Sequence, residues 1–538
     1  MADPERASLD SPPAPPRPGA LEPLRLPVFR MLWFTWLAAN TAMWMNDVAA
    51  AWLMTSIAPS PLWVALVQSA STLPVFFLGL PSGALADILD RRRYFMVTQF
   101  WIAGVSTLLC IAIVLDWLNP LLLLVLTFAS GIGLAMRWPV FAALIPEVVP
   151  RAQLPQAVAL NGVSMNASRI VGPLIAGALI ASVGSEWVFV LNAVLAFAAG
   201  LVIMRWRREH QEHPLGRERL GSAIRVGVQF VRQSSRLRGI LLRISMFFLH
   251  STALMALLPL VAKGLPGGTA GTFTVLLASM GAGAIVMALQ MFRLRAHLSL
   301  QQIVFTGMAV HGVGTLAVAY APTIWVAAPA MFVSGIAWIA VANSLTVATQ
   351  MALPDWVRAR GMSIYQMCLM GSTAAGAALW GQVATWSSVR DSLTASAMIG
   401  VILMGVVQKL AADRGTEEDL SPLAAQVQVP KVDQPPDHGR IQVRIEYLID
   451  PARKAEFLAV MEDSRRSRLR QGALDWQLLH DLQEPGRYVE QITDESWTEH
   501  LRRLARTMAA DIQLRDRRLA FHVGEEPPKV TRYVIEAD

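Results

Sequence analysis

The sequence predicts a helical membrane protein with a small α+β domain at its C-terminal end. The chain has 538 residues, of which 54% are hydrophobic and only 16% are charged, whereas soluble domains average about 25% charged residues. Twelve apolar segments are each long enough to cross a bilayer, which takes about 20 residues in a helix. These segments are Val28–Ser56, Leu62–Ala84, Tyr94–Leu115, Leu121–Phe141, Ala159–Val183, Trp187–Met204, Ile240–Ala262, Thr272–Phe292, Ile303–Tyr320, Ile324–Thr349, Ser363–Trp386 and Ser392–Leu410.

Positive charge alternates from gap to gap along this series. The odd-numbered gaps hold no Lys or Arg except Lys263 and Arg390, whereas the even-numbered gaps are basic, as at 91–93, 205–219 and 358–360. Because cytoplasmic loops retain cations, we expect a multi-pass protein of the bacterial inner membrane with both termini in the cytoplasm. The net charge of +7 does not indicate nucleic-acid binding, since the cations follow the loops.

The segments divide into two similar halves of six. The sequence 145–151 after the fourth segment has a counterpart in 351–358 after the tenth, and a segment rich in small residues follows each. Parallel repeats of this kind are typical of transporters that bind substrate between the halves, near the middle of the membrane. The expected divisions are a disordered tail (1–22), a first half (23–209), a cytoplasmic loop with an amphipathic stretch at Leu220–Val231 (210–237), a second half (238–412), a linker (413–439) and a cytoplasmic domain (440–538).

The last 99 residues predict the element order β-α-β-β-α-β of a ferredoxin-like domain. Apolar and polar residues alternate from Ile441 to Tyr447, as in a half-buried strand. A helix is expected at 451–470, a hairpin at 473–493 and a last strand at 530–535. Ser496, with Glu499 three residues later, predicts a capping box before a helix whose apolar face reaches Met508.

The gap after the second segment carries a charged motif, Gly83-Ala-Leu-Ala-Asp87-Ile-Leu-Asp-Arg91-Arg92-Arg. A glycine allows two helices to cross closely, and a carboxylate is stabilised beside the positive N-terminus of another helix. Arg91 or Arg92 is placed to pair with Glu147. The simpler interpretation is that the three arginines only keep this loop in the cytoplasm.

This motif resembles the loop signature of the major facilitator superfamily, with Ile88 and Asp90 departing from it. The resemblance implies a twelve-helix fold in which Asp87 contacts the eleventh helix. The overall layout and the C-terminal Ser496–Arg502 segment are similar to the bacterial subfamily of the enterobactin exporter and the transmembrane secretion effectors. From this resemblance we expect a proton-coupled exporter of a siderophore-like or amphipathic compound. An importer or uniporter, or a sensor or enzyme acting through the C-terminal domain, stays open.

The fifth segment contains Gly172-Pro173 within a run of small residues. It resembles the antiporter motif of the same superfamily, although Ser168 and Ala176 stand where glycines are usual. Proline removes a backbone hydrogen bond and bends a helix, so a packing kink without any role in antiport is the alternative.

Ionisable residues inside the membrane are costly and usually functional. Asp47, in the first segment, is the candidate proton carrier, unless it lies near the headgroups or only balances an arginine such as Arg169 or Arg137. Arg137 has the alternative of reaching out to the membrane surface. The candidate residues of a substrate cavity are Trp44, Asn46, Arg169, Asn343 and Gln366.

Nothing in the sequence indicates an enzyme, a metal or another cofactor. There is no Walker A motif, and no His/Cys cluster has metal-ligand spacing. The expected partners are the lipid bilayer, a small-molecule substrate and protons, without nucleic acid. The C-terminal domain resembles monooxygenase-like domains that dimerise, so dimerisation or a pocket at Trp476, His480 and His500 remains open.

Overall fold

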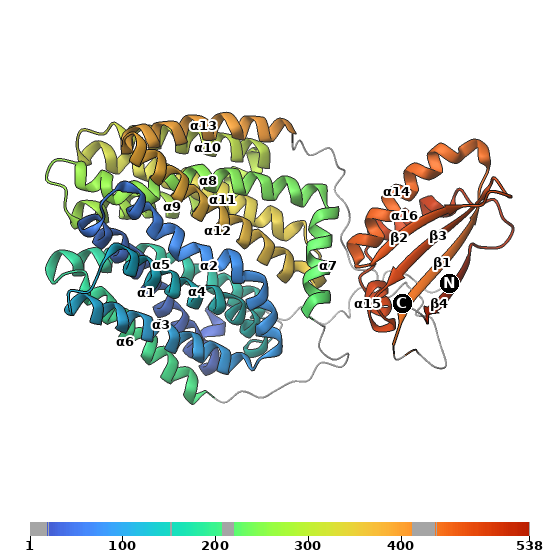
Figure 1. The fold of residues 1–538 in the computed structure, drawn as a ribbon, viewed down its shortest axis with the longest axis horizontal. Helices are drawn as coiled ribbons and strands as arrows, with labels where there is room; N and C mark the ends of the chain where they lie inside the picture. Colours follow the sequence, from blue (N-terminus) through green and yellow to red (C-terminus); the bar gives the residue numbers. More distant parts are fainter. Residues whose placement is uncertain are drawn as a thin grey trace, which may run out of the picture.

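The computed structural model describes residues 19, 21–150, 153–206, 220–410, 436 and 438–536. Long helices form one bundle, and a domain with a four-stranded sheet lies beside one end of it (Figure 1). The first part of the bundle follows a short 3-10 turn, Glu22–Arg25, and contains α1 (Pro27–Ile57), α2 (Pro61–Ile88), α3 (Arg91–Val114), α4 (Pro120–Val148), α5 (Leu154–Ser182) and α6 (Glu186–Arg205). The second part contains α8 (Ser235–Gly264), α9 (Ala270–His297), α10 (Leu300–Ala319), α11 (Ile324–Met351), α12 (Asp355–Trp386) and α13 (Val389–Leu410).

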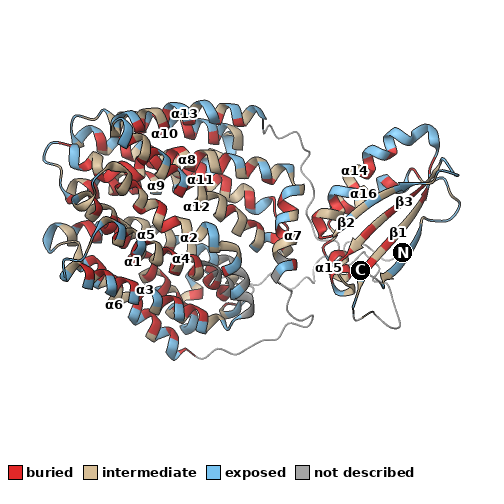
Figure 2. Ribbon diagram, viewed as in Figure 1, coloured by how far each residue is buried: buried red, intermediate tan, exposed pale blue. Residues whose placement is uncertain are grey.

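Ten of the described helices are long and apolar enough to cross a membrane. Two further bundle helices, α1 and α12, are also long but carry more polar residues, including Asp47 and the Arg358–Arg360 region. Many apolar side chains on the outside of the bundle are exposed (Figure 2). Apolar surface of this kind is what a bilayer covers, because lipid tails do not penalise it.

Local chemistry determines where many of these helices begin. Proline occupies the first helical position of α1, α2 and α4, where its missing N–H costs no hydrogen bond. The Asn119 side chain accepts a hydrogen bond from the Leu122 backbone N–H at 2.9 Å, and Asp90 caps α3 by accepting from the Arg93 N–H at 2.8 Å. Polar side chains therefore satisfy N–H groups that a helix start leaves without partners.

The two parts of the bundle meet mainly through α2 against α12 and α5 against α9. Small residues allow these crossings: a β-carbon on Gly177 would overlap the Thr274 side chain on α9. Ser69 of α2 donates to the Ala374 carbonyl of α12 at 2.7 Å, and Lys263 donates to the Thr55 carbonyl at 2.9 Å. These contacts between the parts thus run from the Lys263 end of the bundle into its middle.

The C-terminal domain has the predicted order of strands, with two helices in place of one before the last strand. Its strands pair antiparallel in the order β2-β3-β1-β4. The elements are β1 (Arg440–Leu448), α14 (Lys454–Gln471), β2 (Asp475–His480), β3 (Arg487–Asp494), α15 (Trp497–Ala505), α16 (Ala509–Leu519) and β4 (Lys529–Ile535).

One expectation for this domain was wrong. Met508 does not extend the helix after Ser496, because the Asp511 carboxylate accepts from the Met508 N–H at 3.0 Å and starts a second helix. The Ser496 side chain does cap α15, accepting from the Glu499 N–H at 3.2 Å. The Glu499 carboxylate pairs instead with Arg502, at 2.5 Å.

The amphipathic stretch forms α7 (Leu220–Gln233), which lies between the bundle and the C-terminal domain (Figure 1). Its apolar residues Val226 and Phe230 are buried, and the helix packs on α12 and α8. Its polar side reaches the C-terminal domain: Arg225 pairs with Glu495 at 2.8 Å, and Gln229 donates to the Ala473 carbonyl at 2.8 Å.

Candidate functional site

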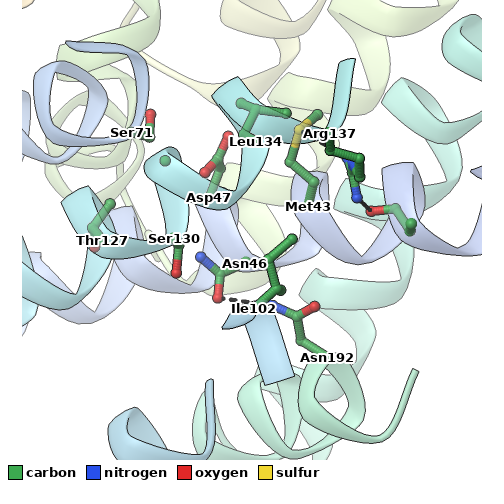
Figure 3. A pocket seen from close by; sticks show the side chains of 12 residues that line it. Met43, Asn46, Asp47, Ser71, Ile102, Thr127, Ser130, Leu134, Arg137 and Asn192 are labelled. Atoms are coloured by element: carbon green, nitrogen blue, oxygen red, sulfur yellow. Dashed lines mark hydrogen bonds between the residues drawn. The ribbon is translucent and has the colours of Figure 1, made fainter. Parts of the chain in front are cut away.

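Asp47 lies beside a cavity in the first part of the bundle that is lined by both polar and apolar side chains. The cavity is about 40 Å³, room for about three waters at roughly 10–15 Å³ each. The side chains around it come from α1, α2, α3, α4 and α6 (Figure 3). They belong to Ala39, Met43, Asn46, Asp47, Ser71, Ile102, Thr127, Ser130, Gly131, Leu134, Arg137 and Asn192.

Several polar atoms around this cavity have no hydrogen-bond partner among the described residues. They are the hydroxyl oxygens of Thr127 and Ser130 and the Nε of Arg137. Buried polar groups are nearly always hydrogen-bonded to protein or ordered water. A cavity of this size and polarity therefore suits water molecules next to Asp47.

Arg137 is buried, with 1% of its surface exposed. It donates to the Ala39 carbonyl at 3.1 Å and to the Asn40 side-chain oxygen at 3.2 Å, and its guanidinium stacks over Trp36 at 5.1 Å. The alternative that Arg137 reaches the membrane surface is therefore wrong in this structure. Its contacts hold it at one wall of the Asp47 cavity.

Asn46 is turned into the first part of the bundle. Its side-chain oxygen accepts from Asn192 of α6 at 3.2 Å, and Asn192 also donates to Ser106 of α3 at 3.1 Å. Sequence reasoning did not identify Asn192, Ser106 or Thr127, although a polar residue inside an apolar segment was a usable signal. The hydrogen bonds direct Asn46 toward α3 and α6 and away from the second part of the bundle.

A second cavity of about 20 Å³ lies where the two parts of the bundle meet. Asp47 and Ser71 line both cavities, and the second is completed by Ala51, Val64, Val67, Gln68, Met255 and Ala256. Asp47 thus lies between the first cavity and the interface of the two parts. Within the described part of the chain its carboxylate has no ion pair, so the alternative, pairing with Arg169 or Arg137, is not formed in this structure.

Arg169 of α5 is held between two indole rings. The centre of its guanidinium lies 5.4 Å from the Trp44 ring of α1 and 3.8 Å from the Trp338 ring of α11. The structure therefore brings together Arg169 and Trp44, as expected, and adds Trp338 from the other part of the bundle. A β-carbon on Gly172 would lie 2.6 Å from the Cβ of Trp44, so this glycine permits the crossing that positions the stack, next to the buried Pro173.

The other two cavity candidates are not part of this stack. Asn343 accepts a hydrogen bond from Arg295 of α9 at 3.0 Å. Gln366 is half-buried on α12. Neither residue lines either of the cavities beside Asp47.

The charged motif lies at the other end of the bundle from Lys263. Arg91 and Glu147 form an ion pair at 2.5 Å that joins α3 to α4. Arg92 donates to the carbonyls of Ile203 and Met204 at the end of α6, a favourable place for a cation. The side chain of Asp87 and the surroundings of Gly83 lie outside what the structure describes.

In the C-terminal domain, Trp476, His480 and His500 do not converge. The Trp476 indole donates to Glu490 at 2.9 Å, His500 contacts Asp494 at 2.7 Å, and His480 stacks on Tyr488. No group of His, Cys, Asp or Glu residues that could hold a metal occurs in the portions of the chain that the structure describes.

Comparisons with known proteins agree with this architecture. The chain is 29% identical over 178 residues to the uncharacterized transporter YfiS of Bacillus subtilis, matching 32% of this chain and 42% of that protein. It is 19% identical over 278 residues to the staphyloferrin A transporter of Staphylococcus aureus, matching 52% of this chain and 70% of that protein. The multidrug efflux pump Tap of Mycobacterium tuberculosis is 31% identical over 220 residues, 38% of this chain and 51% of Tap. The chain thus spans about half the length of YfiS and of Tap.

Solved structures support the fold alone. An inward-facing bacterial homologue of the human lysosomal transporter Spinster superposes with a TM-score of 0.58 at 14% identity, covering 72% of this chain and 97% of that one. A POT family transporter in complex with 5-aminolevulinic acid gives a TM-score of 0.61 at 11% identity, covering 74% and 98%. The model of the transmembrane secretion effector family matches residues 18–538. The chain therefore belongs to this family of major facilitator transporters.

Proposed function

We propose that this protein is a proton-coupled exporter of a small organic molecule, siderophore-like or amphipathic, working by alternating access. The proposal includes twelve membrane-spanning helices in two halves, a bacterial inner-membrane location and cytoplasmic termini. Its main support is the position of Asp47, a carboxylate about two-thirds along α1 that borders both the cavity of the first half and the interface between the halves. Carboxylates at such depth usually face a cavity and act in transport.

In this proposal, Asp47 exchanges a proton with water in the internal cavity while substrate occupies the interface. No ion pair with Asp47 has to break, because the carboxylate has none within the described residues. Arg137, fixed by its bonds to Ala39 and Asn40, supplies a permanent positive charge along the same cavity. Changing the charge on Asp47 changes the balance between conformations, which couples the proton to transport.

The charged motif serves the conformational cycle. The Arg91–Glu147 pair and the Arg92 contacts with α6 hold three helix ends together as one unit. Gly83 and Asp87 are proposed to complete this motif, and Gly172 and Pro173 to set the close crossing of α5 with α1. Dimerisation through the C-terminal domain is a further part of the proposal.

The direction of transport is supported by the relatives. Tap is named a multidrug efflux pump and a Streptococcus pyogenes relative a macrolide efflux protein, 24% identical over 248 residues. The Staphylococcus aureus relative is named as the transporter of a siderophore, staphyloferrin A. An importer or uniporter of the same fold is the alternative. The direction in which substrate moves relative to an imposed proton gradient distinguishes these cases.

Replacing Asp47 with Asn tests the proposal, because an amide is nearly isosteric but carries no proton. A substrate is first found by resistance and accumulation screens of a deletion strain against siderophores and antimicrobials. In proteoliposomes, Asp47→Asn should lose accumulation driven by a pH gradient while retaining exchange of substrate across the membrane. Asp391→Asn is the control, because Asp391 is exposed at a helix start and bonded to Ser388. Normal uphill transport by Asp47→Asn would eliminate Asp47 as the proton carrier.

A further inference from the structure

We propose that Arg169, Trp44 and Trp338 form a binding site for the carboxylate group of a small organic anion. The site rests on the proposed transport function and narrows its substrate class. Its three residues come from the middle of three helices: α5 and α1 in one half, and α11 in the other. A ligand held there would touch both halves near the membrane midplane, where transporters of this architecture bind their substrates.

The guanidinium of Arg169 lies against two indole rings and has no acceptor among the described residues. The Trp44 and Trp338 rings lie 5.4 and 3.8 Å from its centre, and these contacts compensate part of the cost of a cation inside the bundle. Among the described residues, no hydrogen bond or ion pair engages any of its N–H groups. An arginine presents five N–H donors in a rigid plane, and the ring contacts do not occupy these donors, which point outward within that plane.

A second unpartnered donor lies in the same stack. The indole Nε1 of Trp44 is buried without any hydrogen-bond partner among the described residues. Leaving a buried donor without an acceptor costs about 1–3 kcal/mol. Trp44 and Arg169 both require a hydrogen-bond acceptor. An anion supplies one, whereas a neutral hydrogen-bond donor or a cation does not.

The shape of the site favours a carboxylate attached to an apolar body. A guanidinium fork matches the two oxygens of a carboxylate in a bidentate pair. The Trp338 ring is packed edge-on by Phe248 of α8, with ring centres 5.3 Å apart, so an aromatic wall flanks the cation. Asp47, one turn from Trp44 on α1, faces the two cavities and makes no ion pair with Arg169.

The test is equilibrium binding to the purified full-length chain in lipid nanodiscs. The probes are 1-naphthoate, salicylate and citrate, each against its neutral amide, with 1-naphthylmethylamine as the cation. We expect at least one carboxylate to bind at roughly millimolar concentration or below and about tenfold or more tighter than its amide. Arg169→Gln should remove this preference, and Arg169→Lys should keep only part of it, since lysine keeps the charge but loses the fork.

Arg390→Gln is the matched control. Arg390 also stacks on an aromatic ring, Tyr320 at 5.1 Å, but it donates to the Ala319 carbonyl at the end of the bundle. Its replacement should leave carboxylate binding unchanged. Failure of all three carboxylates to bind, an equal affinity for acid and amide, or an unchanged preference in Arg169→Gln would each overturn the site. A loss of thermal stability in Arg169→Gln with unchanged binding would show that the stack only joins the halves, and would overturn it as well.

These outcomes are separable from failure of the proposed function. Arg169-dependent carboxylate binding in a protein whose Asp47→Asn variant transports uphill normally would retain the site and reject proton coupling through Asp47. Proton-driven export of neutral compounds alone, unaffected by Arg169→Gln, would retain the exporter and reject the site.

Discussion

Replacing Glu490 with Gln should destabilise the C-terminal domain by about 3 kcal/mol. Glu490 is fully buried on β3 and lies between the guanidinium groups of Arg468, at 3.3 Å, and Arg518, at 3.2 Å. The Trp476 indole and the Tyr447 hydroxyl donate to the same carboxylate at 2.9 and 3.1 Å. Removing its charge leaves two buried cations without their anion, which costs far more than loss of a surface pair.

The pKa of Glu490 gives the magnitude and the pH range. Burial alone would raise the pKa of this carboxyl group, but Arg468, Arg518 and the Trp476 N–H more than offset burial and lower it from 4.5 to about 2. One pKa unit corresponds to 1.36 kcal/mol, so this shift corresponds to about 3 kcal/mol. Because the folded-state pKa is lowered, the stabilisation is complete above about pH 4.5 and is lost as the pH falls toward 2.

Hydrogen exchange of the full-length chain in nanodiscs measures this effect locally. Peptides covering β3 and α14 should exchange about a hundredfold faster in Glu490→Gln, which is the ratio that 3 kcal/mol implies. Glu446→Gln is the matched control, because Glu446 is a partly exposed strand carboxylate paired with Arg487 at 3.0 Å, and exposed pairs contribute about 0–1 kcal/mol. Equal acceleration in the two variants, or protection in Glu490→Gln, would refute the role assigned to the buried cluster.

Two further predictions concern packing. Glu495→Arg should separate the C-terminal domain from α7, because the new arginine repels Arg225 where an ion pair now forms. The assay is cross-linking of Gln229→Cys to Ala473→Cys with a short bis-maleimide, in a chain without Cys110 and Cys368. The cross-linked fraction should fall several-fold, and unchanged cross-linking would contradict this docking. Gly283→Ala should lower thermal stability by about 1–3 kcal/mol, because a β-carbon there would lie 1.9 Å from the Phe332 carbonyl oxygen. Gly104→Ala, where a β-carbon would meet nothing within 4 Å, is its control in the same melting assay.

The positions of the helices could be predicted because the bilayer imposes one strict requirement on the sequence of a membrane-spanning helix. Each spanning segment must be apolar for about 20 residues, and polar or proline-containing gaps end it. The structure places a long helix on every predicted segment. The break between α15 and α16 was missed because it depends on the Asp511 side chain capping Met508, a local bond that an apolar pattern does not reveal.

The candidate site was only partly predictable. Asp47, Arg169 and Arg137 were identifiable because charge inside an apolar segment is rare. Their partners were not, since periodicity along one helix does not say which other helix it faces. The role of Asn192 could be recognised only from the structure, in which α6 lies beside α1 and Asn192 donates a hydrogen bond to Asn46.

Three charged side chains in the middle part of the bundle, Arg137, Arg169 and Asp47, differ in how completely the protein satisfies them. Arg137 has a carbonyl and an amide oxygen as acceptors and one ring beneath it, so its position is fixed by the first half alone. Arg169 has only aromatic faces, one from each half, and Asp47 has cavities in place of partners. A charged group whose partners all lie in one half moves with that half. A charged group at the interface that lacks such partners responds to the ligand or proton that enters the interface. In the proposed mechanism, this contrast makes Arg137 part of the scaffold, Asp47 the group that meets the proton and Arg169 the group that meets the substrate.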